Sequence, residues 1–365
     1  MKKTSTKHDH LLISDYENEL LTIGLDLGDR SSHYCVLNSK GEISIEGSLQ
    51  SNPAALHKYF AGIRPCRVAL EVGAHSRWAS SLLNDLGFEV IVANTSQVRL
   101  IYESSRKTDK VDARTLARLA RVDPSLLSPI KHRNTSAQSD LCVIRARQAL
   151  VAARTQLINC VRGMVKSFGE RLPTCSSDSF SDRVARLLPE ALRPALDPLC
   201  KQIALLTEQI QSFEQQIQDT ADHQYPETIA LRQVSGVGAL TALTFVLTLE
   251  NPDRFRKSRD VGSYLGLRPK QSQSGQSAPQ LGISKKGDSY LRKLLVGSAQ
   301  YILGRFGCDT DLRRWGLELA KRGGPNAKKR AAVAVARKLA VLLHRLWVDQ
   351  SQYEPLRAPL MHSLN

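Results

Sequence analysis

The sequence has 365 residues, of which 42% are hydrophobic and 24% are charged. This composition excludes a fibrous or disordered chain, and the length corresponds to two or three domains. No run approaches the ~18 apolar residues of a membrane span, and the first twenty residues lack the apolar core of a secretion signal. The seven cysteines are scattered without a CxxC pair, which argues against a disulfide framework or a zinc ribbon and predicts reduced cytosolic thiols.

The net charge of +16 is concentrated near the C-terminus. Residues 1–130 hold 16 basic and 15 acidic side chains, residues 131–225 hold 12 and 10, and residues 226–365 hold 23 and 10. Such an uneven excess indicates a surface for a polyanion, and it favours nucleic acid over an anionic membrane. We therefore expect DNA to contact the last third of the chain, a cytoplasmic, nucleoid-associated location and no membrane partner.

The N-terminal part alternates predicted strands and helices. An apolar run at 20–28 and a hairpin of 33–41 with 42–49 come first. A helix at 53–62, a strand at 66–73, a helix at 76–86 ended by Gly87, and a strand at 88–94 follow. Three antiparallel strands followed by helix, strand, helix and strand are typical of an α/β RNase H-like mixed sheet.

The middle of the chain is predicted to be helical. Helices are expected at 107–121 and from residue 140 to about 168, and the proline-rich stretch 173–198 is expected to turn an antiparallel hairpin. Apolar residues then recur at heptad spacing, which forms a coiled-coil seam. They are Leu199, Ile203, Leu206, Ile210, Phe213 and Ile217. The seam spans only two to three heptads, so it could pair within one chain or between subunits; the need to hold two DNA duplexes favours subunits.

The C-terminal part is predicted to be mostly α-helical. Residues 234–238, V-S-G-V-G, separate two helical patterns as in a helix-hairpin-helix, whose glycines let backbone amides approach a DNA phosphate. A turn without any ligand is the competing interpretation. A loop at 265–282 and a basic helix at 327–347 follow. In that helix a core-facing apolar stripe is expected at Ala332, Val335, Leu339, Leu342 and Leu346.

Four acids lie where a metal site could use them. Asp26 and Glu71 end two apolar strands that are expected to be neighbours, and Asp109 and Asp112 are one helical turn apart. Each acid alone has a structural explanation as a turn residue, an edge charge or a helix-dipole partner. Together they suggest a cation site, because an ionised acid in an apolar strand needs a partner. Such a cluster could hold two Mg²⁺ ions about 4 Å apart at a phosphodiester.

Five segments, in this order and at these separations, resemble the DEDD transposases of insertion sequences, which are related to the Piv-type DNA invertases. They are IGLDLGDRSSHYCVL, ALEVGAHS, KTDKVDARTLARL, VSGVGALTA and YLGLRPKQSQSGQS. The resemblance covers about residues 20–350. It implies an N-terminal tail (1–19), a RuvC-like catalytic domain (20–130), a helical coiled-coil insertion (131–225), a C-terminal transposase domain with a serine loop (226–350) and a tail (351–365).

The resemblance also implies a mechanism. The family's four acids fall on Asp26, Glu71, Asp109 and Asp112, which would bind Mg²⁺, and its nucleophilic serine falls on Ser274. Ser272 and Ser277 lie close by, so the register of the serine is open. The implied partners are double-stranded DNA at the element ends and target, an element-encoded noncoding guide RNA, and further copies of the chain in a homodimer or homotetramer. The implied reaction is strand exchange through a serine–DNA phosphoester.

Three other interpretations remain open from the residues. A hydrolytic RuvC-like nuclease or junction resolvase needs the acids and no serine. An ATP-binding protein of the actin and sugar-kinase type also begins with D-x-G after a strand, as in LDLGDRS, but its second phosphate loop and adenosine motif are absent from the sequence. A non-catalytic DNA-binding protein would leave the four acids unexplained.

Overall fold

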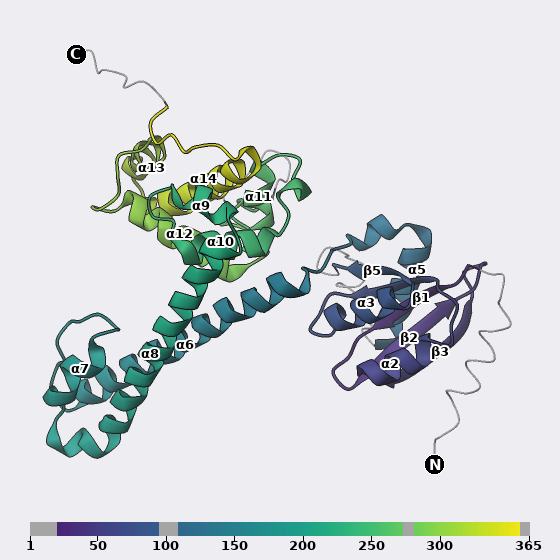
Figure 1. Cartoon of the computed structure of the whole chain (residues 1–365), viewed down its shortest axis with the longest axis horizontal. Helices are drawn as coiled ribbons and strands as arrows, with labels where there is room; N and C mark the ends of the chain where they lie inside the picture. The colour runs from purple at the N-terminus through teal and green to yellow at the C-terminus, as the bar shows by residue number, and fades with distance from the viewer. Residues whose placement is uncertain (1–19, 95–108, 273–280, 358–365) are drawn as a thin grey trace. The chain divides into compact units, whose positions relative to one another are not determined.

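The computed structural model describes residues 20–94, 109–272 and 281–357. The chain divides into two compact units, Met1–His132 and Arg133–Asn365. The first unit contains a β-sheet and the second is helical (Figure 1), and each has its own hydrophobic core. The finer division into five segments stays a prediction.

The first unit is built on a five-stranded mixed sheet. Its strands are β1 (Thr22–Asp26), β2 (Ser31–Leu37), β3 (Ile43–Gln50), β4 (Arg67–Glu71) and β5 (Glu89–Ala93), in the order β3-β2-β1-β4-β5. The first three strands are antiparallel, whereas β1, β4 and β5 are parallel. Because parallel neighbours need a crossover, α2 (Pro53–Phe60) and α3 (Ser76–Asp85) connect the later strands. The predicted order of strands and helices is confirmed.

The two faces of this sheet carry residues of different size. One face has large side chains such as Leu25 and Leu70, which pack with Phe60 of α2 and Leu83 of α3. The other face carries the small residues Gly24 on β1 and Ala69 on β4, and it is covered by α5 (Asp109–Val122). A Cβ atom on Gly24 would lie 2.0 Å from the carbonyl oxygen of Ala113, so only glycine lets α5 come this close to β1.

The chain returns to the edge of the sheet after α5. The 3₁₀ turn η2 (Pro124–Leu127) follows, and Asn94 N–H donates to the Leu127 carbonyl oxygen at 3.0 Å. Ile130 then forms an isolated antiparallel bridge with Val92 of β5. The outer edge of β5 is therefore partly paired by the same chain.

The second unit begins with a long antiparallel helical hairpin, α6 (Thr135–Ser167) and α8 (Arg193–His223) (Figure 1). Late residues of α6 such as Val161 pack with early residues of α8 such as Ile203, and Ile144 packs with Ile217. The predicted seam is thus covered by α6 of its own chain. The expectation that another subunit covers it is corrected, because the 33-residue helix α6 supplies the apolar partners.

The tip of the hairpin is more structured than the turn predicted for 173–198. It contains α7 (Phe180–Val184) and two 3₁₀ turns, and Phe180 and Val184 are fully buried against the hairpin. The helix α8 also begins six residues before the predicted seam. Pro194 is in its first turn, where a missing N–H leaves no acceptor unpaired, and Pro198 lies inside the helix.

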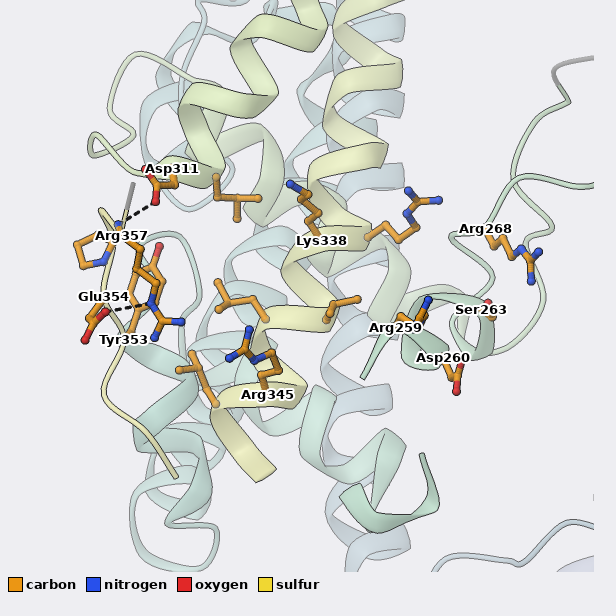
Figure 2. Close-up of a pocket in the computed structure, with 16 residues that line it drawn as sticks. Arg259, Asp260, Ser263, Arg268, Asp311, Lys338, Arg345, Tyr353, Glu354 and Arg357 are labelled. Atoms are coloured by element: carbon orange, nitrogen blue, oxygen red, sulfur yellow. Dashed lines mark hydrogen bonds and ion pairs between the residues drawn. The ribbon is translucent and has the colours of Figure 1, made fainter. Parts of the chain in front are cut away.

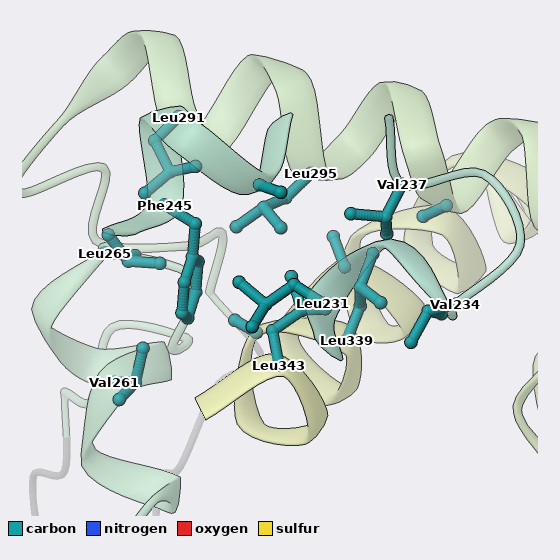
Figure 3. Packing of buried hydrophobic residues seen from close by; sticks show 14 of the residues in the cluster. Leu231, Val234, Val237, Phe245, Val261, Leu265, Leu291, Leu295, Leu339 and Leu343 are labelled. Carbon is teal, nitrogen blue, oxygen red and sulfur yellow. The ribbon is translucent and has the colours of Figure 1, made fainter. Parts of the chain in front are cut away.

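Within the described residues, the rest of the second unit contains six α-helices. They are α9 (Glu227–Arg232), α10 (Ala239–Leu249), α11 (Arg259–Tyr264), α12 (Ser289–Leu303), α13 (Asp311–Lys321) and α14 (Ala327–Asp349). Figure 3 shows their core, in which Phe245 of α10 meets residues of α11 and α12 and Leu339 and Leu343 come from α14. The predicted stripe on α14 is buried except for Leu342, which is half-buried. Among the described helices, none combines the length and apolarity that crossing a membrane requires.

The glycine turn V-S-G-V-G lies between α9 and α10, as predicted. Gly236 has a φ of +89°, and a Cβ there would lie 2.9 Å from Tyr301 and 3.2 Å from the Ser298 carbonyl oxygen. Packing onto α12 therefore explains this glycine without a ligand. A Cβ on Gly238, at the start of α10, would meet no atom within 4 Å.

Candidate active site

Asp26 and Glu71 are the last residues of two neighbouring parallel strands. The registered pairs of β1 and β4 end at Leu25 with Leu70, so the two acids follow side by side. Side chains alternate between the faces of a strand, which puts both acids on the face of Gly24 and Ala69. That is the face covered by α5, and both acids are half-buried there.

Asp109 and Asp112 lie in the first turn of α5. Asp112 is buried, with 5% of its surface exposed, whereas Asp109 is exposed. The residue after Asp112 is Ala113, which contacts Gly24, two residues before Asp26. The start of the helix is thus placed at the carboxyl ends of β1 and β4, and the elements carrying all four acids meet at one end of the sheet.

The donor chemistry of these acids fits a hard divalent cation, which prefers carboxylate oxygens. Within the described residues, however, no three His, Cys, Asp or Glu side chains gather closely enough to hold one ion. The backbone therefore brings the acids to one region, and their side chains are not in the arrangement of a formed metal centre.

His33 belongs to the same region and was not predicted from the sequence. It is the antiparallel register partner of Asp26, and its Nδ1 lies 3.6 Å from Asp109 Oδ2. This nitrogen is buried and has no hydrogen-bond partner in the described part of the chain. The signal in the sequence was the short stretch 27–30 between the first two strands, since a short turn after Asp26 puts the next strand directly opposite it.

A second imidazole ties together the two loops that follow the acidic strand ends. His75 Nδ1 accepts a hydrogen bond of 3.1 Å from Trp78 Nε1–H, which places the ring proton on Nε2. Nε2 lies 3.8 Å from Asp29 Oδ1. His75 follows Glu71 in the chain and Asp29 follows Asp26, so the ring links both loops.

Polar contacts fix α5 on the sheet. The guanidinium of Arg114 makes a two-pronged ion pair with Glu46 of β3, and Arg67 of β4 donates to the Ala120 carbonyl oxygen at 3.0 Å. The hydrogen bond from Arg114 lowers the pKa of Glu46. Burial, and then the charge of Glu46, raise the pKa of the Cys35 thiol to about 12. These contacts hold the helix that carries two of the four acids.

The predicted nucleophile, Ser274, lies outside the described residues, as does Ser277, whereas Ser272 is described and exposed. Backbone pairing closes the base of the serine loop. Pro269 and Ile283 form an antiparallel bridge, and Lys270 N–H donates to the Gly282 carbonyl oxygen at 2.9 Å.

A groove of about 840 Å³ runs beside α14 in the second unit (Figure 2). Its lining includes the apolar Leu342 and Leu346 and six cations: Arg259, Arg268, Arg337, Lys338, Arg345 and Arg357. Three acids lie in the same groove, and Arg357 pairs with one of them, Glu354, at 3.0 Å. The predicted basic helix has a basic surface, because six of its cations are exposed: Lys328, Lys329, Arg330, Arg337, Lys338 and Arg345.

Comparison with known families now adds to this geometry. A DEDD transposase family of the IS110 type, described as "Transposase", matches residues 23–169, and the "Transposase IS116/IS110/IS902 family" matches residues 229–313. The chain belongs to the DEDD transposases of insertion sequences. The first match contains the four acids of this transposase and the second contains Ser274. The ATP-binding and non-catalytic interpretations are therefore set aside.

Individual relatives agree with the family. The transposase is 27% identical to the transposase for insertion sequence element IS1111A of Coxiella burnetii, over 79% of each chain. It is 28% identical to a probable family 20 transposase of Pseudomonas aeruginosa, over 92% of this chain and 99% of the relative. It is also 28% identical to the transposase for element IS1328 of Yersinia enterocolitica, over 90% and 96%.

Proposed function

We propose that this transposase exchanges DNA strands through a covalent serine–DNA phosphoester, with Ser274 as nucleophile and Asp26, Glu71, Asp109 and Asp112 as the acidic site. The observation that carries the proposal is the meeting of two acidic strand ends with the first turn of α5. The strand order of the sheet supports assigning the first unit to the RNase H-like, RuvC-like class. The antiparallel α6–α8 pair similarly supports a coiled-coil insertion.

The acidic site would hold two Mg²⁺ ions. Bound there, Mg²⁺ would withdraw charge from the phosphodiester and favour the ionised form of the attacking hydroxyl. The four carboxylates would have to approach one another when the ions bind, which suits the exposed and half-buried positions of Asp109, Asp26 and Glu71. The packing of α5 on Gly24 and the Arg114–Glu46 pair keep the backbone fixed while the side chains move.

The serine chemistry accounts for rejoining. Ser274 Oγ forms a bond to phosphorus, the bond from phosphorus to one sugar oxygen breaks, and that oxygen leaves as a hydroxyl after taking up a proton. The phosphoester keeps the energy of the broken bond, so a hydroxyl of another DNA end can displace the serine in the reverse step. Hydrolysis by water would lose that energy.

The proposed partners follow from the charge and from the family. The basic surface of the second unit supports binding of double-stranded DNA, with Gly238 at the open start of α10 as one contact. An element-encoded noncoding RNA would guide the reaction, and exchange between two duplexes would need two or four copies of the chain. Since the α8 seam is covered within one chain, a different surface would join the copies.

The experiment that tests this function looks for protein attached to DNA. Purified transposase with its RNA and a plasmid carrying the element is stopped with denaturant, and the attached peptide is identified by mass spectrometry. We expect an adduct on Ser274, and loss of both adduct and cleavage in Ser274→Ala, with Ser272→Ala as the matched control. An adduct on Ser277 would keep the mechanism and change the residue. Cleavage retained in Ser274→Ala without any adduct would establish the hydrolytic nuclease instead.

A further inference from the structure

A second groove, of about 730 Å³, lies at the base of the serine loop. Pro269, Leu281 and Ile283 of the loop base form one wall. The end of α13 and the first half of α14 form the other. The groove therefore lies directly beside the two chain segments that lead into and out of the loop.

The charge of this groove has one sign. Five cations line it, Lys285, Arg322, Lys329, Arg330 and Arg337, and no acid is among its described lining residues. All five are exposed. Arg330 donates to the Gly323 carbonyl oxygen at 3.1 Å, and the side chains of the other four make no ion pair in the described part of the chain. The groove of Figure 2, in contrast, includes three acids among its lining residues.

The charges at the start of α14 are unfavourable when no anion is present. The first turn of α14 contains Lys328, Lys329 and Arg330 and no acid, although the positive end of a helix dipole disfavours cations there. A bound polyanion would offset both the mutual repulsion of the cations and their interaction with the helix dipole.

We propose that this groove, which we call the loop-base groove, binds the sugar–phosphate backbone of the DNA strand that enters the serine loop. The inference rests on the proposed function, because the loop is assigned to the reaction through Ser274. Lys285, Arg322 and Lys329 act as positioning residues that hold phosphates next to the reacting one. The apolar wall of Pro269, Leu281 and Ile283 lies where deoxyribose faces could contact it.

The test compares two double variants of the full-length chain that have the same charge. Arg322→Gln with Lys329→Gln removes two cations of the loop-base groove. Lys321→Gln with Lys328→Gln removes the adjacent cation from each of the same two elements, and neither of these lines the groove. Binding of a short fluorescein-labelled DNA duplex of mixed sequence is measured by anisotropy over a salt series, with a hairpin RNA of equal length as the comparison probe.

We expect the groove variant to bind DNA about tenfold more weakly for each cation removed at ~0.1 M salt, and its salt slope to fall by about 2. The control pair should weaken binding by a clearly smaller factor, because neither side chain lines the groove and so neither would contact a phosphate held in it. Equal effects of the two pairs on DNA binding would overturn the proposal. A loss confined to the RNA hairpin would overturn it too. The binding measurements do not depend on the serine adduct. Failure of the proposed function would be recognised separately, because the wild type would then form no adduct.

Discussion

Gly24 of β1 and Ala113 of α5 lie so close that a Cβ on residue 24 would be 2.0 Å from the Ala113 carbonyl oxygen and 2.6 Å from the Ala117 nitrogen. Both obstacles are backbone atoms, which cannot rotate away. The first turn of α5, with Asp109 and Asp112, is therefore positioned by backbone contact at a residue two places before Asp26.

Gly24→Ala should consequently disturb the acidic site from a distance. We expect the free energy of unfolding to fall by about 3 kcal/mol, because α5 has to shift away from β1. Recombination should fall with it even at temperatures where the variant is folded by circular dichroism. Gly73→Ala is the matched control, since a Cβ there meets no atom within 4 Å and its stability should change by less than about 0.5 kcal/mol. Equal stability of the two variants would contradict the contact.

The acidic site should also respond to metal in the absence of DNA. If Asp26 binds Mg²⁺, the wild type should become more stable as the Mg²⁺ concentration rises. At ten times the Kd the free energy of unfolding should increase by about 1.4 kcal/mol, which raises the Tm by about 3–6 °C. Asp26→Asn should lose this rise. Without metal it should be at least as stable as the wild type, because one repelling carboxylate is gone. Asp29→Asn, at a side chain 95% exposed, should keep the rise. Identical metal responses in all three proteins would remove Asp26 from the site.

The Arg114–Glu46 ion pair predicts a particular pH dependence. Arg114 lowers the pKa of Glu46, so the folded state holds its proton less tightly than the unfolded state does. The ion pair's contribution to the free energy of unfolding is fully present above the ordinary glutamate pKa of 4.5. It is lost as pH falls through the lower pKa that Glu46 has in the folded state. Glu46→Gln should therefore melt below the wild type at pH 7, and the two melting curves should converge in acid. A difference in Tm that stayed constant from pH 7 to the acid limit would mean that the ion pair contributes nothing.

The helical hairpin gives a further test with adjacent residues. Leu206 is 6% exposed, whereas Leu205 is 52% exposed. Leu206→Asp should lower the free energy of unfolding by about 3 kcal/mol or more, because the charge is buried between α8 and α6. Leu205→Asp should be nearly neutral. Light scattering should give both variants the mass of the wild type. A lower mass for Leu206→Asp alone would instead show that the seam of α8 pairs between subunits.

The sequence predicted the fold best where a pattern is local. The hairpin around residues 38–42 and the helix that carries the predicted seam depend on neighbours within one or two turns, and both elements form as expected. The expected partner of the seam, another subunit, was not a local property and had to be corrected. The tip around Phe180 was read as a bare turn, since its burial depends on two helices that are distant in the sequence. His33 was missed for a similar reason. Its nearness to Asp109 requires a strand and a helix separated by 76 positions to meet.

The bridge between Ile130 and Val92 also bears on how the sheet resists unwanted pairing. A free strand edge is a template for a strand of another molecule. On the β5 side the chain itself occupies part of that template, immediately before the second unit begins at Arg133. In the described part of the chain β3 is the other edge strand, eight residues long. The outer edge of β3 is therefore the longer template for a strand from a neighbouring molecule, at the edge opposite the point where the chain leaves the sheet.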